Sequence, residues 1–189
     1  MSEANTRGQG VTQRERILQA AYLRIAQDGM GKTTVEDVAR DANVSRPTVY
    51  RHFPGGKDAL FAEVVAWEAE RFIDELTHAV APHTHLADIL EELIVVGAER
   101  INAHQVLQKV LQTEPERLLP LLVFQSDRLI TAVRRFVESA GVHQDEAADY
   151  IARMVLSVMG APGAWDLADR SQVAQLVRTQ LLARVTDVT

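Results

Sequence analysis

The stretch that decides the fold is Thr33–Phe53, which reads TTVEDVARDANVSRPTVYRHF. Its apolar residues recur at three- and four-residue intervals on both sides of a short polar interruption, a spacing that predicts two short helices joined by a tight turn. Ser45 is placed to cap the second helix, and Pro47 falls in its first turn. Asn43 lies in the interruption, where asparagine tolerates left-handed backbone. This stretch therefore predicts a helix-turn-helix.

The two faces of this predicted motif differ in chemistry. Its inward positions are apolar and are expected to pack on the first helix: Val35, Val38, Ala39, Val44, Val49 and Phe53. Its outward positions carry hydrogen-bond donors or positive charge: Ser45, Arg46, Thr48, Tyr50, Arg51 and His52. In a helix-turn-helix the second helix enters the major groove of DNA, where phosphate contacts set the position and contacts to base edges read the sequence. The outward face therefore indicates DNA binding.

Charge is distributed unevenly along the 189-residue chain, whose net charge is −6. Residues 1–57 carry nine Lys or Arg and six Asp or Glu, a net charge of +3, whereas residues 58–189 carry a net charge of −9. A basic head on an acidic body suits a protein that meets phosphate at one end. We therefore predict a DNA-binding domain over residues 1–57, with residues 1–10 as a mobile tail, and a second domain over residues 58–189.

Most of the remaining chain has helical periodicity, and no alternating strand pattern exceeds a few residues. Gln13–Gln27 supplies the first helix, and Gly29 suits the left-handed position beyond its end. The further predicted helices are Lys57–Ala79, Leu86–Ala103, His104–Thr113, Glu116–Leu122, Ser126–Ala140, Gln144–Met159 and Ser171–Val185. The expected fold is all-α with about nine helices, in which a three-helix N-terminal domain precedes a C-terminal helical bundle.

Several classes of protein are disfavoured by the same sequence. The chain contains no cysteine, which excludes disulfide scaffolds and thiol catalysis. Its longest uncharged apolar stretch, Leu118–Phe124, is too short to cross a bilayer, and the N-terminus lacks the apolar segment of a signal peptide. The pair His83 and His85 is read as part of an exposed connection between helices rather than as a metal site. We expect no enzyme activity, no cofactor and no metal, and a cytoplasmic location.

The stretch from Arg16 to Leu60 resembles the DNA-binding region of the TetR (tetracycline-repressor) family of bacterial transcriptional regulators. The resemblance is carried by Ala20-Ala21, Gly29, Thr33–Ala39, Val44-Ser45, Thr48–Phe53 and Lys57–Leu60. It departs from the family pattern at Asn43, which replaces the usual turn glycine, and by one extra residue between Phe53 and Lys57. The resemblance implies a homodimeric regulator, most simply a repressor, that leaves a near-palindromic operator when a small-molecule effector binds the C-terminal bundle.

The resemblance also implies roles for single residues of the head. Thr33 or Thr34 would contact phosphate at a helix N-terminus. Arg46 and Thr48 would face bases, since arginine can bind guanine bidentately. Tyr50, His52 and Lys57 would contact phosphate, and Arg51 would reach a base or a phosphate. The full expected DNA-binding set is Thr33, Thr34, Ser45, Arg46, Thr48, Tyr50, Arg51, His52 and Lys57.

The acidic body is rich in apolar residues, which are expected mainly to form a packed core. The resemblance implies that some of them line an effector cavity: Leu90, Leu93, Ile94, Leu107, Leu111, Leu122, Phe124, Met154 and Trp165, with Arg128 as a polar anchor. Such a lining suits a hydrophobic or amphipathic effector, because small-molecule pockets have mostly apolar walls and a few polar anchors. Further possible anchors are Arg100, Asn102, His104 and Gln125.

The last two helices carry a second apolar stripe, suited to a four-helix bundle with a twofold copy of the chain. The expected dimer interface is Tyr150, Met154, Val158, Val173, Leu176, Val177 and Leu181. The alternative is that both faces pack within one chain. Other readings of function are an activator, a regulator controlled by a protein partner, or an all-α ligand-binding protein or enzyme whose helix-turn-helix is incidental.

Overall fold

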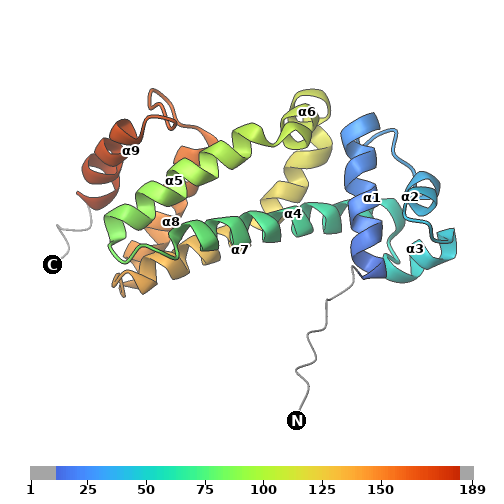
Figure 1. Ribbon diagram of the computed structural model, residues 1–189, viewed down its shortest axis with the longest axis horizontal. Coiled ribbons are helices and arrows are strands. Elements are labelled where there is room, and N and C mark those ends of the chain that lie inside the picture. The colour runs from blue at the N-terminus through green and yellow to red at the C-terminus, as the bar shows by residue number, and fades with distance from the viewer. Residues whose placement is uncertain (1–11, 184–189) are drawn as a thin grey trace, which may run out of the picture. The chain divides into compact units, whose positions relative to one another are not determined.

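The protein is all-α, as the sequence predicts. The computed structural model describes residues 12–183, and the expectation for residues 1–10 lies outside that range. Within it the elements, shown in Figure 1, are α1 (Gln13–Asp28), α2 (Val35–Asp41), α3 (Arg46–His52), α4 (Gly56–Val80), α5 (Leu86–Ala103), α6 (Gln105–Thr113), α7 (Pro115–Ser139), α8 (Asp145–Gly160), α9 (Arg170–Leu176) and the π-helix η1 (Val177–Leu182). Among these residues there is no strand.

By its internal contacts the chain divides into two compact units, and the division falls between Val64 and Val65, inside α4. The predicted functional boundary between residues 57 and 58 stays a prediction. None of the helices in residues 12–183 combines the length and the apolar character that crossing a bilayer requires.

The N-terminal unit is held together by a small apolar core. A capping box starts α1, because the Thr12 hydroxyl accepts from the backbone N–H of Glu15 and the Glu15 carboxylate accepts from that of Thr12. Gly29 ends α1 with a φ of 85°, as its position predicted. The expected inward residues Val38, Val49 and Phe53 are buried, as is the apolar stripe of α1. This packing fixes α2 and α3 on α1.

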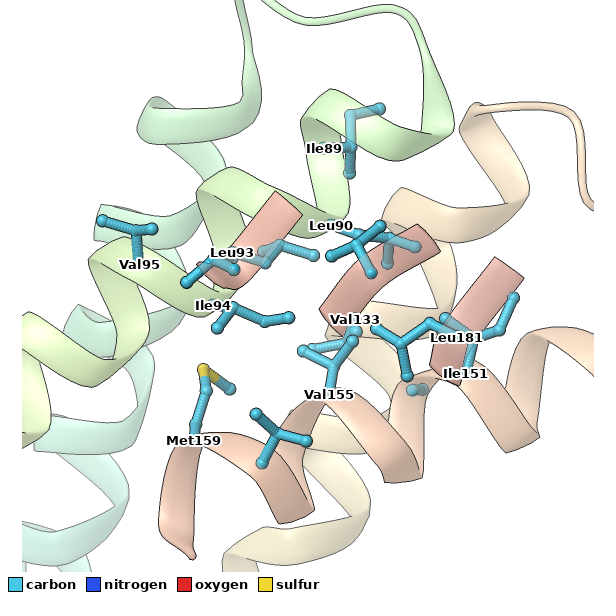
Figure 2. Close-up of a cluster of buried hydrophobic side chains, with 14 of the residues drawn as sticks. Ile89, Leu90, Leu93, Ile94, Val95, Val133, Ile151, Val155, Met159 and Leu181 are labelled. Carbon is cyan, nitrogen blue, oxygen red and sulfur yellow. The ribbon is translucent and has the colours of Figure 1, made fainter. Parts of the chain in front are cut away.

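The second unit is built around α5, which packs against α7, α8, α9 and η1. Figure 2 shows side chains from α5, such as Leu93 and Ile94, meeting Val155 of α8 and Leu181 of η1 in one apolar cluster. Gly97 of α5 allows close contact with α8, because a Cβ atom there would lie 2.1 Å from the sulfur of Met159. The core is thus a continuous layer of aliphatic side chains.

One prediction of element boundaries is wrong. The sequence predicts two helices, Glu116–Leu122 and Ser126–Ala140, whereas α7 runs without a break from Pro115 to Ser139. The gap predicted at residues 123–125 is therefore helical, and Pro120, which lies inside the first of the two predicted helices, is accommodated within α7.

The final predicted helix, Ser171–Val185, corresponds to α9 followed directly by η1. The change to π-helical hydrogen bonding begins at Val177 and extends to Leu182. The end predicted at Val185 lies outside the described residues.

Candidate nucleic-acid interface

Local capping and one turn residue set the geometry of the helix-turn-helix. The Thr34 hydroxyl accepts from the backbone N–H of Asp37 at 3.2 Å, and the Ser45 hydroxyl accepts from that of Thr48 at 3.3 Å. Each contact satisfies an otherwise unpaired N–H at the start of α2 or α3. Asn43 has a φ of 53°, so asparagine performs the left-handed turn where the family usually has glycine. The departure at this position leaves the motif intact.

The outward face of α3 presents the expected polar residues to solvent. Arg46, Tyr50 and Arg51 are exposed, while Thr48 and His52 are half-buried beside them. Val49, on the opposite face of α3, is fully buried against the rest of the unit. One apolar residue therefore anchors the helix, and the polar side of the helix faces solvent.

Arg46 does not extend freely into solvent. Its guanidinium lies 2.6 Å from a carboxylate oxygen of Glu36, on α2, and donates to the Tyr50 hydroxyl at 3.4 Å. It also lies over the Tyr50 ring, 5.4 Å from the centroid. The hydrogen bond to Tyr50 and the charge of Glu36 raise the pKa of Arg46 above its ordinary value. A base contact by Arg46 would have to replace the Glu36 contact.

Gln13 is a functional candidate that sequence reasoning missed. Its side-chain oxygen accepts from Arg51 at 3.3 Å and lies 3.1 Å from Nε2 of His52. The only signal in the sequence is its place in the first turn of α1, which says nothing about a contact 39 residues away. Gln13 orients two side chains that were expected to bind DNA.

Lys57 lies in the first turn of α4, directly after the extra residue by which the sequence departs from the family pattern. Gly56 has a φ of 69°, and a Cβ there would lie 3.3 Å from the Tyr50 ring, so the glycine permits a tight approach of the chain to α3. The Lys57 ammonium donates to the carbonyl of Gly31 at 2.9 Å and lies 5.3 Å from the Phe61 ring centroid. In the free protein Lys57 therefore contacts the loop before α2.

The expectation for Thr33 needs correction. This residue is fully buried, and its hydroxyl donates to the carbonyl of Gly29 at 2.7 Å. Its side chain is used to close the loop between α1 and α2, and cannot reach a phosphate. Thr34 is exposed at the start of α2 and is the member of the pair that stays a candidate.

The expected effector lining stays a prediction. Leu90, Leu93 and Ile94 are fully buried in the core, whereas Phe124 is 78% exposed. A pocket of about 430 Å³ lies between the end of α5, α6 and the segment that follows α8. Leu111 and Trp165 are the two predicted residues that line it, together with Asn102 from the possible anchors. The predicted residues outside this lining are Leu90, Leu93, Ile94, Leu107, Leu122, Phe124, Arg128 and Met154.

Most of the expected dimer interface lies in the core of the single chain. Five of its residues are buried there: Val158, Val173, Leu176, Val177 and Leu181. They face α5 and its neighbours, because α9 and η1 complete the bundle within the protomer. Tyr150 and Met154 are half-buried at its edge. Within the described residues this apolar stripe packs on the same chain, which was the alternative to a dimer interface, and the interface between copies stays a prediction.

A charged cluster links α4 to the junction of α5 and α6. Nδ1 of His104 accepts from the backbone N–H of Leu107 at 3.0 Å, so the neutral ring carries its proton on Nε2, which lies 3.0 Å from Glu68. Arg100 donates to the same Glu68 oxygen at 3.3 Å. Burial raises the pKa of Glu68, but the His104 hydrogen bond and the charges of Arg71 and Arg100 outweigh it, so that the pKa lies below its ordinary value.

Comparison with known proteins gives the same answer as the motif. Residues 17–64 match the model of the family described as "Bacterial regulatory proteins, tetR family". The chain is similar to the probable acrEF/envCD operon repressor of Escherichia coli K12, at 33% identity over 112 residues that cover 56% of this chain and 50% of that protein. It is also similar to the HTH-type transcriptional repressor KstR2 of Mycobacterium tuberculosis, at 24% identity with 94% and 93% covered. The chain thus spans about half the length of the Escherichia coli relative.

Solved structures support the fold over nearly the whole chain. Salmonella enterica GusR superposes with a TM-score of 0.64 at 22% identity, covering 96% of this chain and all of that one. The transcriptional regulator FadR from Bacillus subtilis, solved in complex with stearoyl-CoA, gives a TM-score of 0.58 at 16% identity, with 87% and 97% covered. The helix-turn-helix geometry, the family match and the named relatives agree, and over residues 17–64 the chain matches the TetR family of bacterial regulatory proteins.

Proposed function

We propose that the chain is a DNA-binding transcriptional regulator, and specifically a repressor, that binds its operator through α2 and α3. The observation that carries this proposal is the exposed polar face of α3, with Arg46, Tyr50 and Arg51 in solvent beside the capped start of α2. The face combines an arginine suited to guanine with several donors suited to phosphate. The word repressor in the names of two relatives supports the sign of regulation.

The proposed phosphate contacts come from Thr34, Tyr50, His52 and Lys57, and the proposed base contacts from Arg46 and Thr48. Ser45 shapes the start of α3 through its capping contact, and its hydroxyl lies 2.8 Å from that of Thr48. Arg51 reaches either a base or a phosphate. Since phosphate contacts position the protein and base contacts give specificity, loss of the first group weakens binding to all DNA and loss of the second changes sequence preference.

The proposed active form is a homodimer in the cytoplasm, where the operator lies. A dimer of helix-turn-helix heads reads two half-sites separated by about 34–36 Å or a multiple of it, which accounts for a near-palindromic operator. Since the last two helices bury most of their apolar residues within one chain, we place the interface on the exposed apolar ridge of α7. This ridge consists of Leu119, Val123 and Phe124, which are 50%, 68% and 78% exposed.

A small molecule is the proposed signal for release from DNA. The pocket of about 430 Å³ in the C-terminal unit is within the size range of small-ligand sites. The fold neighbour FadR was solved in complex with stearoyl-CoA, which supports a small-molecule ligand for a protein of this fold. To release the operator, the ligand has to bind the DNA-free state more tightly than the DNA-binding state.

Selection of binding sites from a random pool of duplex DNA tests the proposal. The full chain is expected to enrich one sequence built of two inverted half-sites. A chain with Arg46→Ala and Thr48→Ala is expected to lose that enrichment. The matched control is Arg128→Ala, which removes an arginine outside the helix-turn-helix, and this variant should enrich the same sequence. Recovery of unrelated sequences by the unaltered chain would contradict the proposal.

A further inference from the structure

Gln13, in the first turn of α1, contacts two residues on the exposed face of α3. Its side-chain oxygen Oε1 lies 3.3 Å from a guanidinium nitrogen of Arg51 and 3.1 Å from Nε2 of His52. Gln13 and Arg51 are exposed and His52 is half-buried, so the three side chains meet at the surface that is proposed to bind DNA. One amide thereby joins α1 to the proposed DNA-binding face of α3.

This arrangement fixes which nitrogen of the neutral His52 ring carries the proton. A guanidinium can only donate hydrogen bonds, so the Gln13 atom beside Arg51 has to be the amide oxygen. The same oxygen lies beside Nε2 of His52, and an amide oxygen can only accept. In the neutral ring Nε2 is therefore the protonated nitrogen, and Nδ1 carries a lone pair.

A neutral ring in this state cannot donate a hydrogen bond to phosphate while it keeps the Gln13 contact. Phosphate oxygens are acceptors, and the lone pair of Nδ1 is an acceptor as well. Protonation adds an N–H at Nδ1, so His52 can then donate to Gln13 through Nε2 and to phosphate through Nδ1. The charged ring is therefore the form that can make both contacts.

The charged groups around the His52 ring come from three elements. Arg51 of α3 shares the Gln13 oxygen with His52. The Phe53 ring lies 6.3 Å from the His52 ring, and the Arg14 guanidinium of α1 lies 5.7 Å from the Phe53 centroid. Arg14 pairs with Glu63 of α4, whereas His52 itself forms no ion pair with a carboxylate of residues 12–183. A phosphate of bound DNA would therefore supply the negative charge that stabilises the protonated ring.

We propose that Gln13 is a positioning residue that makes operator binding depend on pH. Because it holds the Nε2 proton of His52, the histidine contacts phosphate only in its charged form, and the complex takes up a proton at this ring. Histidine loses its charge between about pH 5 and 8, so operator affinity is highest at the acid end of this range and falls as the pH rises. The inference rests on the proposed function, since it concerns the same interface.

Fluorescence anisotropy of the full chain with its selected operator, at constant ionic strength between about pH 6 and pH 8, tests the inference. The affinity of the unaltered chain is expected to fall about 5- to 30-fold over this range, because each of two heads loses a charge-assisted contact. His52 is the one histidine among residues 1–64. His52→Gln is therefore expected to bind more weakly at pH 6 and to lose most of the pH dependence.

Variants of Gln13 separate positioning from a structural role. Gln13→Met keeps the side-chain length and a similar helix propensity but removes the acceptor, so the neutral ring can turn an N–H toward phosphate. Its affinity is expected to change only about 2- to 3-fold over the same pH range. Gln13→Glu retains an acceptor and is expected to keep the pH dependence, at lower affinity because its charge repels phosphate. Gln19→Met, at an exposed position about 120° around α1, is the matched control and should behave as the unaltered chain does.

Nitrogen-15 NMR of the DNA-free chain examines the tautomer directly, because protonated and unprotonated ring nitrogens differ in chemical shift. The His52 signals, assigned by their loss in His52→Gln, are expected to show the proton on Nε2 above about pH 8. Circular dichroism spectra and unfolding midpoints show whether each variant is folded.

Two results would overturn the inference: a neutral His52 ring with its proton on Nδ1, or a pH dependence in Gln13→Met as steep as that of the unaltered chain. Tight operator binding that does not change with pH would also contradict this inference and would leave the proposed regulatory function untouched. Failure to bind any operator at any pH would contradict the proposed function itself.

Discussion

At the residue scale, contacts between side chains already organise the proposed interface in the free protein. Glu36 and Tyr50 hold Arg46, and Gln13 holds Arg51 and His52. The outward set on α3 could be predicted from the sequence, because helical periodicity fixes which side each residue takes. The contacts made by Glu36 and Gln13 could not be predicted, because they join α3 to other helices. Both of these partners are polar residues without a distinctive sequence pattern.

Arg46→Ala is expected to weaken binding to the selected operator by about 1–3 kcal/mol and to relax preference at one base pair, because a bidentate base contact is lost. Fluorescence anisotropy with the operator and with each single-base variant measures both effects. If Arg46→Ala lowers the affinity equally for all of the base-pair variants and for unrelated DNA, Arg46 contacts a phosphate instead of a base.

Glu36→Gln is expected to have the opposite effect. The substitution removes a carboxylate that competes for Arg46 at 2.6 Å and that repels nearby phosphates. Because both partners are exposed, the gain in operator affinity is expected to be small, about 0.2–1 kcal/mol, and larger at low salt. Weaker binding of this variant would mean that Glu36 positions Arg46 for DNA instead of competing with it.

At the scale of elements, most helix positions followed from periodicity and capping signals, and the failures have identifiable causes. The gap predicted at residues 123–125 is helical instead, because α7 runs without a break from Pro115 to Ser139. The stripes of α9 and η1 suit either a dimer interface or packing within one chain, and in the described residues they pack on the core. Periodicity shows that a face is buried and does not show against which surface.

The α5–α8 contact depends on a missing side chain. Gly97→Ala would place a Cβ atom 2.1 Å from the Met159 sulfur, so the methionine has to move, and we expect a loss of about 1–3 kcal/mol in the free energy of unfolding. Gly160→Ala on α8 is the matched control, since a Cβ there meets no atom within 4 Å. Urea unfolding compares the two, and similar stabilities would show that the contact is loose.

The cluster that joins α4 to α6 gives stability that depends on pH. The folded-state pKa of Glu68 is lowered, so its contribution is fully present above the ordinary carboxyl pKa near 4.5 and is lost as the pH falls through the folded-state value. Glu68→Gln is expected to cost about 1–3 kcal/mol at pH 7, and the difference from the unaltered chain should shrink below about pH 4.5.

Urea unfolding of both chains at several pH values measures that difference. Glu70→Gln, an exposed carboxylate on the same helix that pairs with Arg128 at 2.8 Å, is the control and is expected to cost no more than about 1 kcal/mol at pH 7. A Glu68→Gln difference that stays constant down to acid pH would show that packing, and not the charge of the carboxylate, accounts for the effect.

At the scale of the whole molecule, the regulatory account requires two copies of the chain on one operator. The α7 ridge of Leu119, Val123 and Phe124 is the proposed contact between them. Phe124→Glu is expected to shift the protein toward the monomer in sedimentation velocity, because burying a carboxylate at this position is costly. Thr131→Glu, on an exposed turn of the same helix, should leave the dimer intact. A persistent Phe124→Glu dimer would place the interface elsewhere.

The most direct test of the central claim is the ratio of two affinities: that of the full chain for its selected operator and that for a shuffled duplex of the same composition, at physiological salt. The account predicts a ratio of at least about 10³, with both affinities falling as salt rises because counterions are released from phosphates. Equal affinity for the two duplexes, or no binding to either at low salt, would contradict it.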